Sequence, residues 1–190
     1  MGQNKSKILF EWDYTDGYDA DHFVADSRIT MTDDGIRAET VSGAHINNVY
    51  LKIKNVNIPA SSRCTIEYAN AEMRDGSYGD VGFCAFSLLS NDAIALSKVA
   101  DTSTGKFYLN TSYRTSPINL PPSKSGTITV TYDADNEMLY AEKDGVTWSQ
   151  RIGQIETPNQ TGNLVRVYRN GGSESTQTSV LIKHIRIERL

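Results

Sequence analysis

The sequence has few cysteines and histidines, which many metal-binding and nucleophilic sites use. Its 190 residues include two cysteines, and its three histidines, His22, His45 and His184, lie far apart. No C-x-x-C pair occurs, which excludes a zinc knuckle or a dithiol redox motif. No G-x-S-x-G nucleophile motif occurs either. These absences argue against metal catalysis by a histidine cluster and against serine hydrolase chemistry.

Basic residues and long apolar runs are also scarce. Lys and Arg number 19 against 23 Asp and Glu, which gives a formal net charge of −4 without a basic stripe. This balance argues against a nucleic-acid partner. No run approaches the ~20 apolar residues that a membrane-spanning helix needs, so we expect a soluble chain.

The first seven residues are polar and lack the apolar core of a signal peptide. We expect residues 1–7 to be a polar leader and residues 8–190 to form one domain. Gly2 and Ser6 also match the N-myristoylation motif M-G-x-x-x-[ST], so lipidation is the alternative for this segment. The location in the cell stays open, and would be extracellular or virion-associated if the sequence is a trimmed form.

The two cysteines, Cys64 and Cys84, both lie in apolar alternating runs. An unpaired cysteine behaves as a small hydrophobic residue. We therefore predict two buried free thiols, with a disulfide between them as the alternative.

Alternation of apolar and polar residues with a period of two dominates the chain and predicts β-strands. Only residues 91–100 suggest a helical turn or two. Asp-Gly and Asn-Gly bends separate the alternating runs, because these residues adopt left-handed backbone readily. Short strands at this spacing predict an all-β sandwich or barrel. We predict strands over residues 8–14, 29–32, 35–40, 49–53, 63–73, 80–89, 106–111, 126–133, 137–143, 147–152, 163–168 and 180–189.

The clearest part of this pattern is the segment TITVTYDADNEMLYAEKDGVTW, residues 127–148. Thr127, Thr129 and Thr131 alternate with apolar residues, which gives the first strand one polar and one apolar face. A polar bend at residues 133–136 and a second bend at residues 144–145 divide the segment into three strands. The segment therefore predicts a β-meander.

Three groups of motifs occur in a characteristic order. They are the opening FEWDYTDG with its later D-G hairpin, Y-D-x-D-x-x-x-L-Y with the following D-G bend in the meander, and the closing strand VLIKHIRI. Their order resembles the concanavalin A-like superfamily, which includes laminin-G-like, lectin-like and glycosidase-associated domains. This resemblance implies an antiparallel jelly-roll β-sandwich. Such folds include enzymes, lectins and structural modules alike.

Laminarinase-like glycosidases of this superfamily carry E-x-D-x-x-E on one strand. The nearest match here is Glu67 to Glu72, with Ala69 in place of the middle acid. On a regular strand, positions five apart face opposite sides of the sheet, whereas a retaining pair needs its carboxyl groups ~5–5.5 Å apart. A bulge would bring the two residues to one face, but nothing in the sequence demands one. We therefore predict that the protein is not an enzyme.

Four acids, Asp13, Asp16, Asp19 and Asp21, lie within nine residues. Calcium prefers several such oxygen ligands, and many concanavalin A-like domains bind it. We therefore consider a structural calcium ion near Asp16 or Asp19 as the one candidate cofactor. The alternative is a solvated acidic turn whose side chains bond local amides.

Carbohydrate is the predicted ligand, because sugar recognition needs aromatic faces and planar polar groups on pre-formed turns. For Tyr78 and Trp148 the alternative is packing within the sandwich, and Arg114 could be a solvated cation. The predicted ligand-binding residues are Tyr78, Asp80, Asn110, Tyr113, Arg114 and Trp148.

The leading function is therefore a non-catalytic, lectin-like module. The first alternative is a structural or interaction subunit, such as a virion or phage-tail appendage, which forms a homo-oligomer or larger assembly through its sheet edges. The second alternative is a laminarinase-like glycoside hydrolase.

Overall fold

The computed structural model describes residues 7–40, 46–72, 79–83, 94–97, 100, 107–111, 114–153, 161–170 and 178–190. The elements are β1 (Lys7–Asp13), η1 (Tyr14–Asp16, a 3₁₀ turn), β2 (Ile29–Thr32), β3 (Gly35–Glu39), β4 (Ile46–Lys54), β5 (Ser62–Glu72), β6 (Gly79–Phe83), β7 (Ile94–Ser97), β8 (Phe107–Thr111), β9 (Arg114–Ile118), β10 (Gly126–Asp133), β11 (Met138–Lys143), β12 (Val146–Arg151), β13 (Thr161–Asn170) and β14 (Ser179–Arg189).

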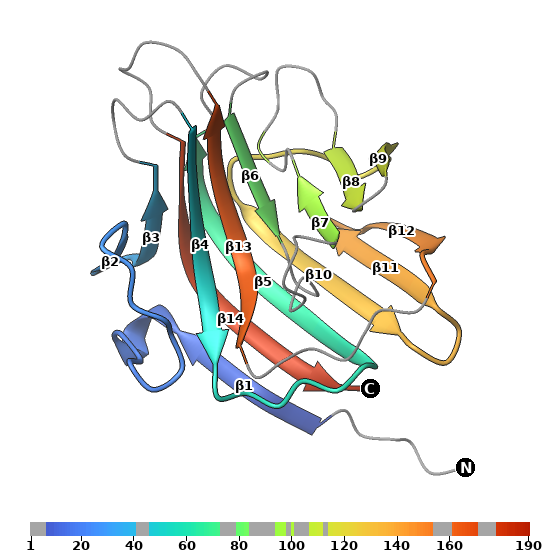
Figure 1. The fold of residues 1–190 in the computed structure, drawn as a ribbon, viewed down its shortest axis with the longest axis horizontal. Helices are drawn as coiled ribbons and strands as arrows, with labels where there is room; N and C mark the ends of the chain where they lie inside the picture. The colour runs from blue at the N-terminus through green and yellow to red at the C-terminus, as the bar shows by residue number, and fades with distance from the viewer. Residues whose placement is uncertain are drawn as a thin grey trace.

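These strands form two antiparallel sheets that lie as two layers (Figure 1). Sheet A has eight strands in the order β12-β11-β10-β5-β14-β3-β2, with β1 also pairing with β14. Sheet B has six strands in the order β4-β13-β6-β7-β8-β9. The protein is thus an antiparallel β-sandwich, and the predicted fold class is confirmed.

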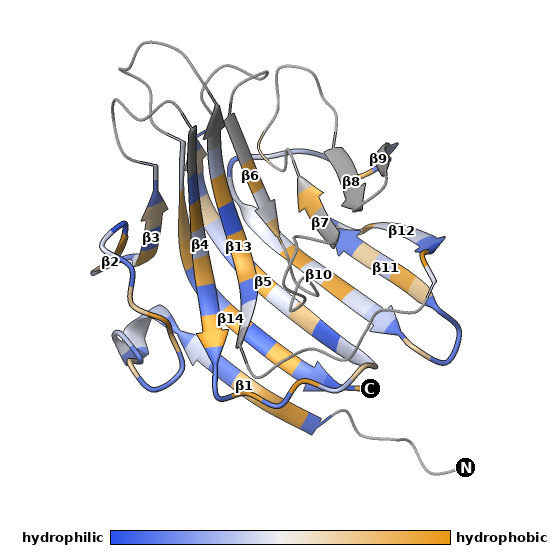
Figure 2. Ribbon diagram, in the orientation of Figure 1, coloured by the Kyte–Doolittle hydropathy of each residue, from blue (hydrophilic) through white to orange (hydrophobic). Residues whose placement is uncertain are grey.

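The core lies between the two sheets because the strands alternate. Figure 2 shows hydrophobic and hydrophilic residues taking turns along β5, β10 and β14. Strand β10, for example, buries Ile128, Val130 and Tyr132 and turns its threonines outward. Each large apolar side chain buried in this way contributes roughly 1.5–3 kcal/mol.

Aromatic residues close the core near the N-terminal strand. Trp12 is 2% exposed, and its ring meets Phe23 edge-on at 5.4 Å between centroids. Its indole Nε1 donates a hydrogen bond to the Gly17 carbonyl at 2.8 Å. Trp12 therefore ties β1 to the bend that follows η1.

The free thiol predicted for Cys64 is confirmed: the residue is buried and unpaired. Burial raises the pKa of this thiol to about 12, so the sulfur stays protonated and unreactive. Cys84 lies outside the described residues.

Two strands differ from the sequence-based predictions. Residues 94–97, within the predicted helical segment, form strand β7, because Leu96 pairs with Phe83 and Leu109 and is buried in the core. Strand β9 was missed. It contains Pro117, which is tolerated because β9 is the edge strand of sheet B and needs no ladder donor on its outer side. In the described part of the chain no helix is long and apolar enough to cross a membrane.

The two bends of the meander are held differently. Asp133 closes the first bend locally, accepting hydrogen bonds from the backbone N–H groups of Asp135 and Asn136 at 3.1 and 3.2 Å. At the second bend the fully buried Lys143 pairs with Asp144 and donates to Ser123 Oγ at 2.7 Å. This lysine therefore ties the β11–β12 hairpin to the connection that precedes β10.

Candidate functional site

A groove of about 880 Å³ lies on the outer face of sheet A. It lies over β14, β5, β10, β11 and β12, the strands that carry the meander and its neighbours. The residues between its outward-facing side chains, such as Leu139 and Val130, belong to the core. The groove is therefore formed by the polar outer face of strands whose inner face contributes to the core.

Strand register arranges the groove side chains in two lines that run across the strands. The Tyr140 row consists of Glu188, Arg63, Thr131, Tyr140 and Ser149, each opposite the next on the neighbouring strand. The Glu142 row, two residues further along each strand, consists of Arg186, Thr65, Thr129, Glu142 and Thr147. All ten residues line the groove.

Hydrogen bonds between neighbouring strands hold some of the hydroxyl groups in each row. In the Glu142 row, Thr65 Oγ1 and Thr129 Oγ1 are 3.1 Å apart. In the Tyr140 row, Arg63 Nε donates to Thr131 Oγ1 at 3.3 Å. These bonds hold side chains on rigid strands, which lowers the entropy lost when a ligand binds.

At the β14 end of the rows an ionic network surrounds Arg186. Its guanidinium donates to Glu188 at 3.1 Å and pairs with Glu11 at 3.5 Å. His184 Nε2 lies 3.3 Å from the same Glu11 carboxylate. The charge of Arg186 is therefore balanced within the fold.

Tyr140 is the exposed aromatic residue of the groove, with 40% of its surface accessible. The residue was not among the predicted ligand-binding residues, and neither was any other member of the two rows. The signal that could have found them is the alternation of β10, whose polar threonine face was recognised. The register that places Tyr140 opposite Thr131 appears only in the folded sheet.

Trp148, a predicted ligand-binding residue, is half-buried and packs against the core. It lies opposite the buried Ala141, so it belongs to the inward-facing set of β12 and only borders the groove. Packing within the sandwich was the alternative stated for it. A role for Trp148 in binding stays a prediction.

The other predicted ligand-binding residues do not lie on sheet A in the described structure. Tyr78 and Tyr113 lie outside the described residues. Asp80 is in β6, Asn110 in β8 and Arg114 in β9, all strands of sheet B. Strands β8 and β9 are neighbours, whereas Trp148 belongs to the other sheet. The predicted set is thus divided between the two sheets, and its role stays a prediction.

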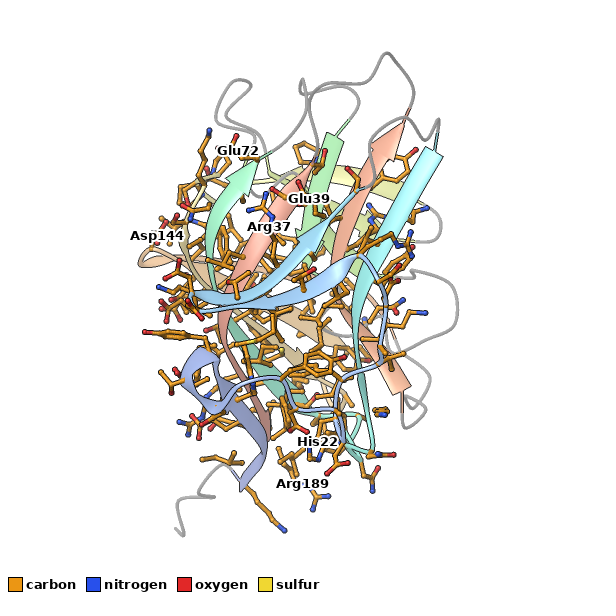
Figure 3. All side chains as sticks on the ribbon, turned by 90° about the vertical axis from the view of Figure 1, so that its left-hand side faces the viewer. His22, Arg37, Glu39, Glu72, Asp144 and Arg189 are labelled. Carbon is orange, nitrogen blue, oxygen red and sulfur yellow. The ribbon has the colours of Figure 1, made fainter. Side chains whose placement is uncertain are left out.

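The acidic turn near the N-terminus is held by local bonds. Asp16 accepts a hydrogen bond from the backbone N–H of Asp13 at 3.0 Å. Asp19 pairs with His22 Nδ1 at 2.7 Å (His22 is labelled in Figure 3) and accepts from two backbone N–H groups. Partial burial opposes ionisation of Asp19, but the bonds from His22 and Asp21 outweigh it and lower its pKa. No group of three or more metal-binding side chains occurs among the described residues, and the calcium site stays a prediction.

The expectation that Glu67 and Glu72 face opposite sides of the sheet is wrong. Asn70 adopts left-handed backbone (φ 49°), and the register between β5 and β14 shifts at this bulge. Both glutamates are therefore exposed on one face. Their separation along the strand is still roughly 13–16 Å, and Glu72 pairs with Lys124 at 3.0 Å. These two residues are thus too far apart to form the retaining pair.

No protein-family model matches the chain, and no curated protein matches its sequence. Solved structures do match its fold. The carbohydrate recognition domain of Emp47p superposes with a TM-score of 0.64 at 13% identity, over 99% of each chain. A β-glucanase from Bacillus licheniformis superposes with a TM-score of 0.57 at 14% identity, over 99% of this chain and 100% of the other. The protein has the concanavalin A-like fold.

A third match is a sialidase, with a TM-score of 0.59 at 10% identity. Here 96% of this chain covers 19% of the sialidase chain. The concanavalin A-like fold thus matches a domain-sized part of a much longer protein as well as whole chains.

The prediction that the protein is not an enzyme is wrong, because it was inferred only from the missing E-x-D-x-x-E motif. Structures with the same fold over nearly the whole chain include a β-glucanase and a transglycosylase. One absent carboxylate pattern therefore does not exclude catalysis for this chain.

Proposed function

We propose that the protein binds carbohydrate in the groove on the outer face of sheet A. The observation that carries the proposal is the Tyr140 row, where an exposed aromatic ring lies in line with a threonine, a serine and a guanidinium group. An aromatic face packs against the C–H surface of a sugar ring, and planar or hydroxyl groups bond its hydroxyls.

Two further observations support the proposal. Strand pairing positions the residues of both rows, and cross-strand hydrogen bonds hold Thr65, Thr129, Arg63 and Thr131, so part of the surface is ordered before a ligand arrives. The structures that share the fold include a carbohydrate recognition domain and a β-glucanase, and the names of both refer to carbohydrate ligands or substrates.

The test is a glycan array followed by titration calorimetry with the strongest binder. We expect Tyr140→Ala to weaken binding at least about tenfold, since it removes an exposed aromatic face of the groove. Tyr140→Phe keeps the ring and should bind nearly as the parent protein does.

Tyr18→Ala is the matched control, because Tyr18 is 38% exposed, close to the 40% of Tyr140, but lies outside the groove. Its binding should equal that of the parent protein. The proposal fails if no glycan binds, or if Tyr140→Ala binds as tightly as Tyr18→Ala. Tyr78→Ala on the same array tests the separate set of residues predicted from the sequence.

The bound glycan also shows whether binding is accompanied by cleavage. New reducing ends after incubation with the parent protein would identify a hydrolase, and an unchanged glycan would identify a binding module. Either result is compatible with a carbohydrate site at the groove.

A further inference from the structure

We infer that the groove takes an uncharged, linear oligosaccharide that lies across the strands, with Arg63 and Glu142 as its specificity-determining polar residues. The inference rests on the proposed function and names the class of ligand. It follows from the direction of the two rows, from the open end of the groove and from the balance of charge within it.

The two rows set the shape of the bound ligand. Each row crosses five strands from β14 to β12, and neighbouring strands are about 4.7–4.9 Å apart, so a row is roughly 19 Å long. The rows are two residues apart along each strand, which is only about 7 Å. A pyranose unit in an extended chain is about as long as one step between strands. A linear chain of about four units therefore fits this polar surface better than a single sugar.

The groove continues to the edge of the sheet. Ser149 and Thr147, the last members of the two rows, lie on β12, which is the terminal strand of sheet A. No further strand of sheet A closes this end in the described part of the chain. A chain longer than the rows can therefore pass over the β12 edge, so the site need not select a chain end.

Two charged groups of the groove, Arg186 and Glu188, neutralise each other. Arg186 is paired with Glu188 and Glu11. Asp133 accepts two backbone N–H bonds and a bond from Asn136 Nδ2 at 2.7 Å. The Arg186 pairs therefore contribute little net charge toward a ligand. The neutral donors on Asp133 lower its pKa and keep it ionised, so this carboxylate adds a negative charge to the groove that also disfavours an anionic ligand.

Two charged members of the rows themselves are not paired in this way. Arg63 donates its Nε hydrogen bond to Thr131 and forms no ion pair with the described residues. Glu142 forms neither an ion pair nor a hydrogen bond through its carboxylate among the described residues. One is a donor and one an acceptor, on strands that flank β10, and their charges cancel.

This pair suits the hydroxyl groups of a neutral sugar. The guanidinium of Arg63 offers a planar fork of N–H donors, and the carboxylate of Glu142 accepts hydrogen bonds from neighbouring hydroxyls. An anionic sugar would gain an ion pair with Arg63 but would meet Glu142 within the same groove. The geometry therefore favours uncharged chains over uronate chains.

The experiment uses the full chain and two sets of probes at low salt. The neutral set is gluco- and manno-oligosaccharides of one to six units, and the anionic set is oligogalacturonates of the same lengths. We expect affinity for one neutral set to rise at least about tenfold from one to four units and then to level off. We expect the oligogalacturonates to bind at least about tenfold more weakly than neutral chains of equal length.

Two charge variants separate specificity from folding. Glu142→Gln should improve binding of the anionic set while weakening that of the neutral set, and Arg63→Gln should weaken both. A destabilised fold would lower both affinities in both variants, so the opposite responses of Glu142→Gln identify a specificity role.

The outcomes distinguish this inference from the proposed function. If Tyr140→Ala abolishes binding but a single sugar binds as tightly as four units, the groove is confirmed as the site and the inference fails. The inference also fails if oligogalacturonates bind more tightly than neutral chains. If no oligosaccharide binds at all, both fail.

Discussion

Asp34-Gly35 and Asp144-Gly145 are the same dipeptide in the same role, a bend between two strands, yet different forces secure them. Gly35 lies against β14, and a Cβ atom there would be 2.3 Å from the Ile182 carbonyl oxygen. A Cβ atom on Gly145 would meet none of the described atoms within 4 Å. In the first bend the glycine is required by packing, and in the second only by its φ of 77°.

For the aspartates the contrast is reversed, because the one in the second bend is connected to the core and, among the described residues, the one in the first bend is not. Asp34 is exposed, and its backbone N–H donates to Thr32 Oγ1 at 3.3 Å. Asp144 pairs with the buried Lys143, and it lies at the edge of the molecule in Figure 3. A dipeptide can therefore predict a bend without showing which of its two residues connects it to the rest of the fold.

The largest effect is expected where the glycine is packed. Gly35→Ala should lower the free energy of unfolding by about 4 kcal/mol, because the new methyl group collides with backbone and the φ of 143° is also unfavourable. Urea denaturation measures this loss. Gly17→Ala is the control, because its φ of 74° is also positive but no described atom lies within 4 Å of the new Cβ, and it should lose about 2 kcal/mol from backbone strain alone. Equal losses would contradict the role of the β14 contact.

The buried lysine comes next. Lys143→Ala should cost about 3 kcal/mol, since it leaves a cavity at a fully buried position and removes a hydrogen-bond donor to Ser123 Oγ. Lys143→Met keeps most of the volume and should cost clearly less, because Asp144 is 49% exposed and can be solvated. Thermal denaturation of both variants tests the order. If methionine is as damaging as alanine, the charge rather than the packing secures this bend.

A smaller loss is expected at Gly145. Gly145→Ala should cost about 1 kcal/mol, because only the left-handed backbone resists the side chain. Gly145→Asn should cost less, since asparagine tolerates this conformation. Urea denaturation compares both with Gly35→Ala, and a loss at Gly145 as large as that at Gly35 would remove the distinction between the two bends.

The smallest effect concerns acid at the first meander bend. Hydrogen bonds from the Asn136 side chain and from the backbone of Asn136 and Asp135 lower the pKa of Asp133 below 3.8. The stability that these bonds contribute is therefore present above pH 3.8 and is lost as the pH falls through the lowered pKa. NMR titration of the Asp133 carboxyl should show its pKa rising toward 3.8 in Asn136→Ala. An unchanged pKa would mean that the backbone bonds alone hold this bend.

The meander was predictable because its local features agree with one another. The alternation of β10, the polar bend at residues 133–136 and the Asp-Gly bend after β11 all indicate the same three strands, and the structure contains them. Strand β7 was not predictable, because its short sequence is also compatible with a helical turn. Only the pairing of Leu96 with β6 and β8 in the folded sheet identifies it as a strand. The bulge at Asn70 was missed because asparagine also occurs in ordinary strands and loops.

The groove was harder to predict than the fold, for a physical reason. Alternation shows that Thr129 and Thr131 face away from the core, but not which residues of other strands lie beside them. Arg63 and Tyr140 are 77 positions apart in the numbering and share a row only through the register of β10 with both neighbours. Local pattern determines the face of a residue, and long-range pairing determines its neighbours.

The two tryptophans of the chain occupy contrasting environments: Trp12 is 2% exposed in the core, and Trp148 is half-buried beside the groove. Their emission spectra should differ accordingly, with Trp12 at the shorter wavelength. In Trp148→Phe the remaining tryptophan, Trp12, would report unfolding of the core. In Trp12→Phe the remaining tryptophan, Trp148, would report ligand binding at the groove beside β12. The molecule thus carries two built-in optical reporters that need no added dye.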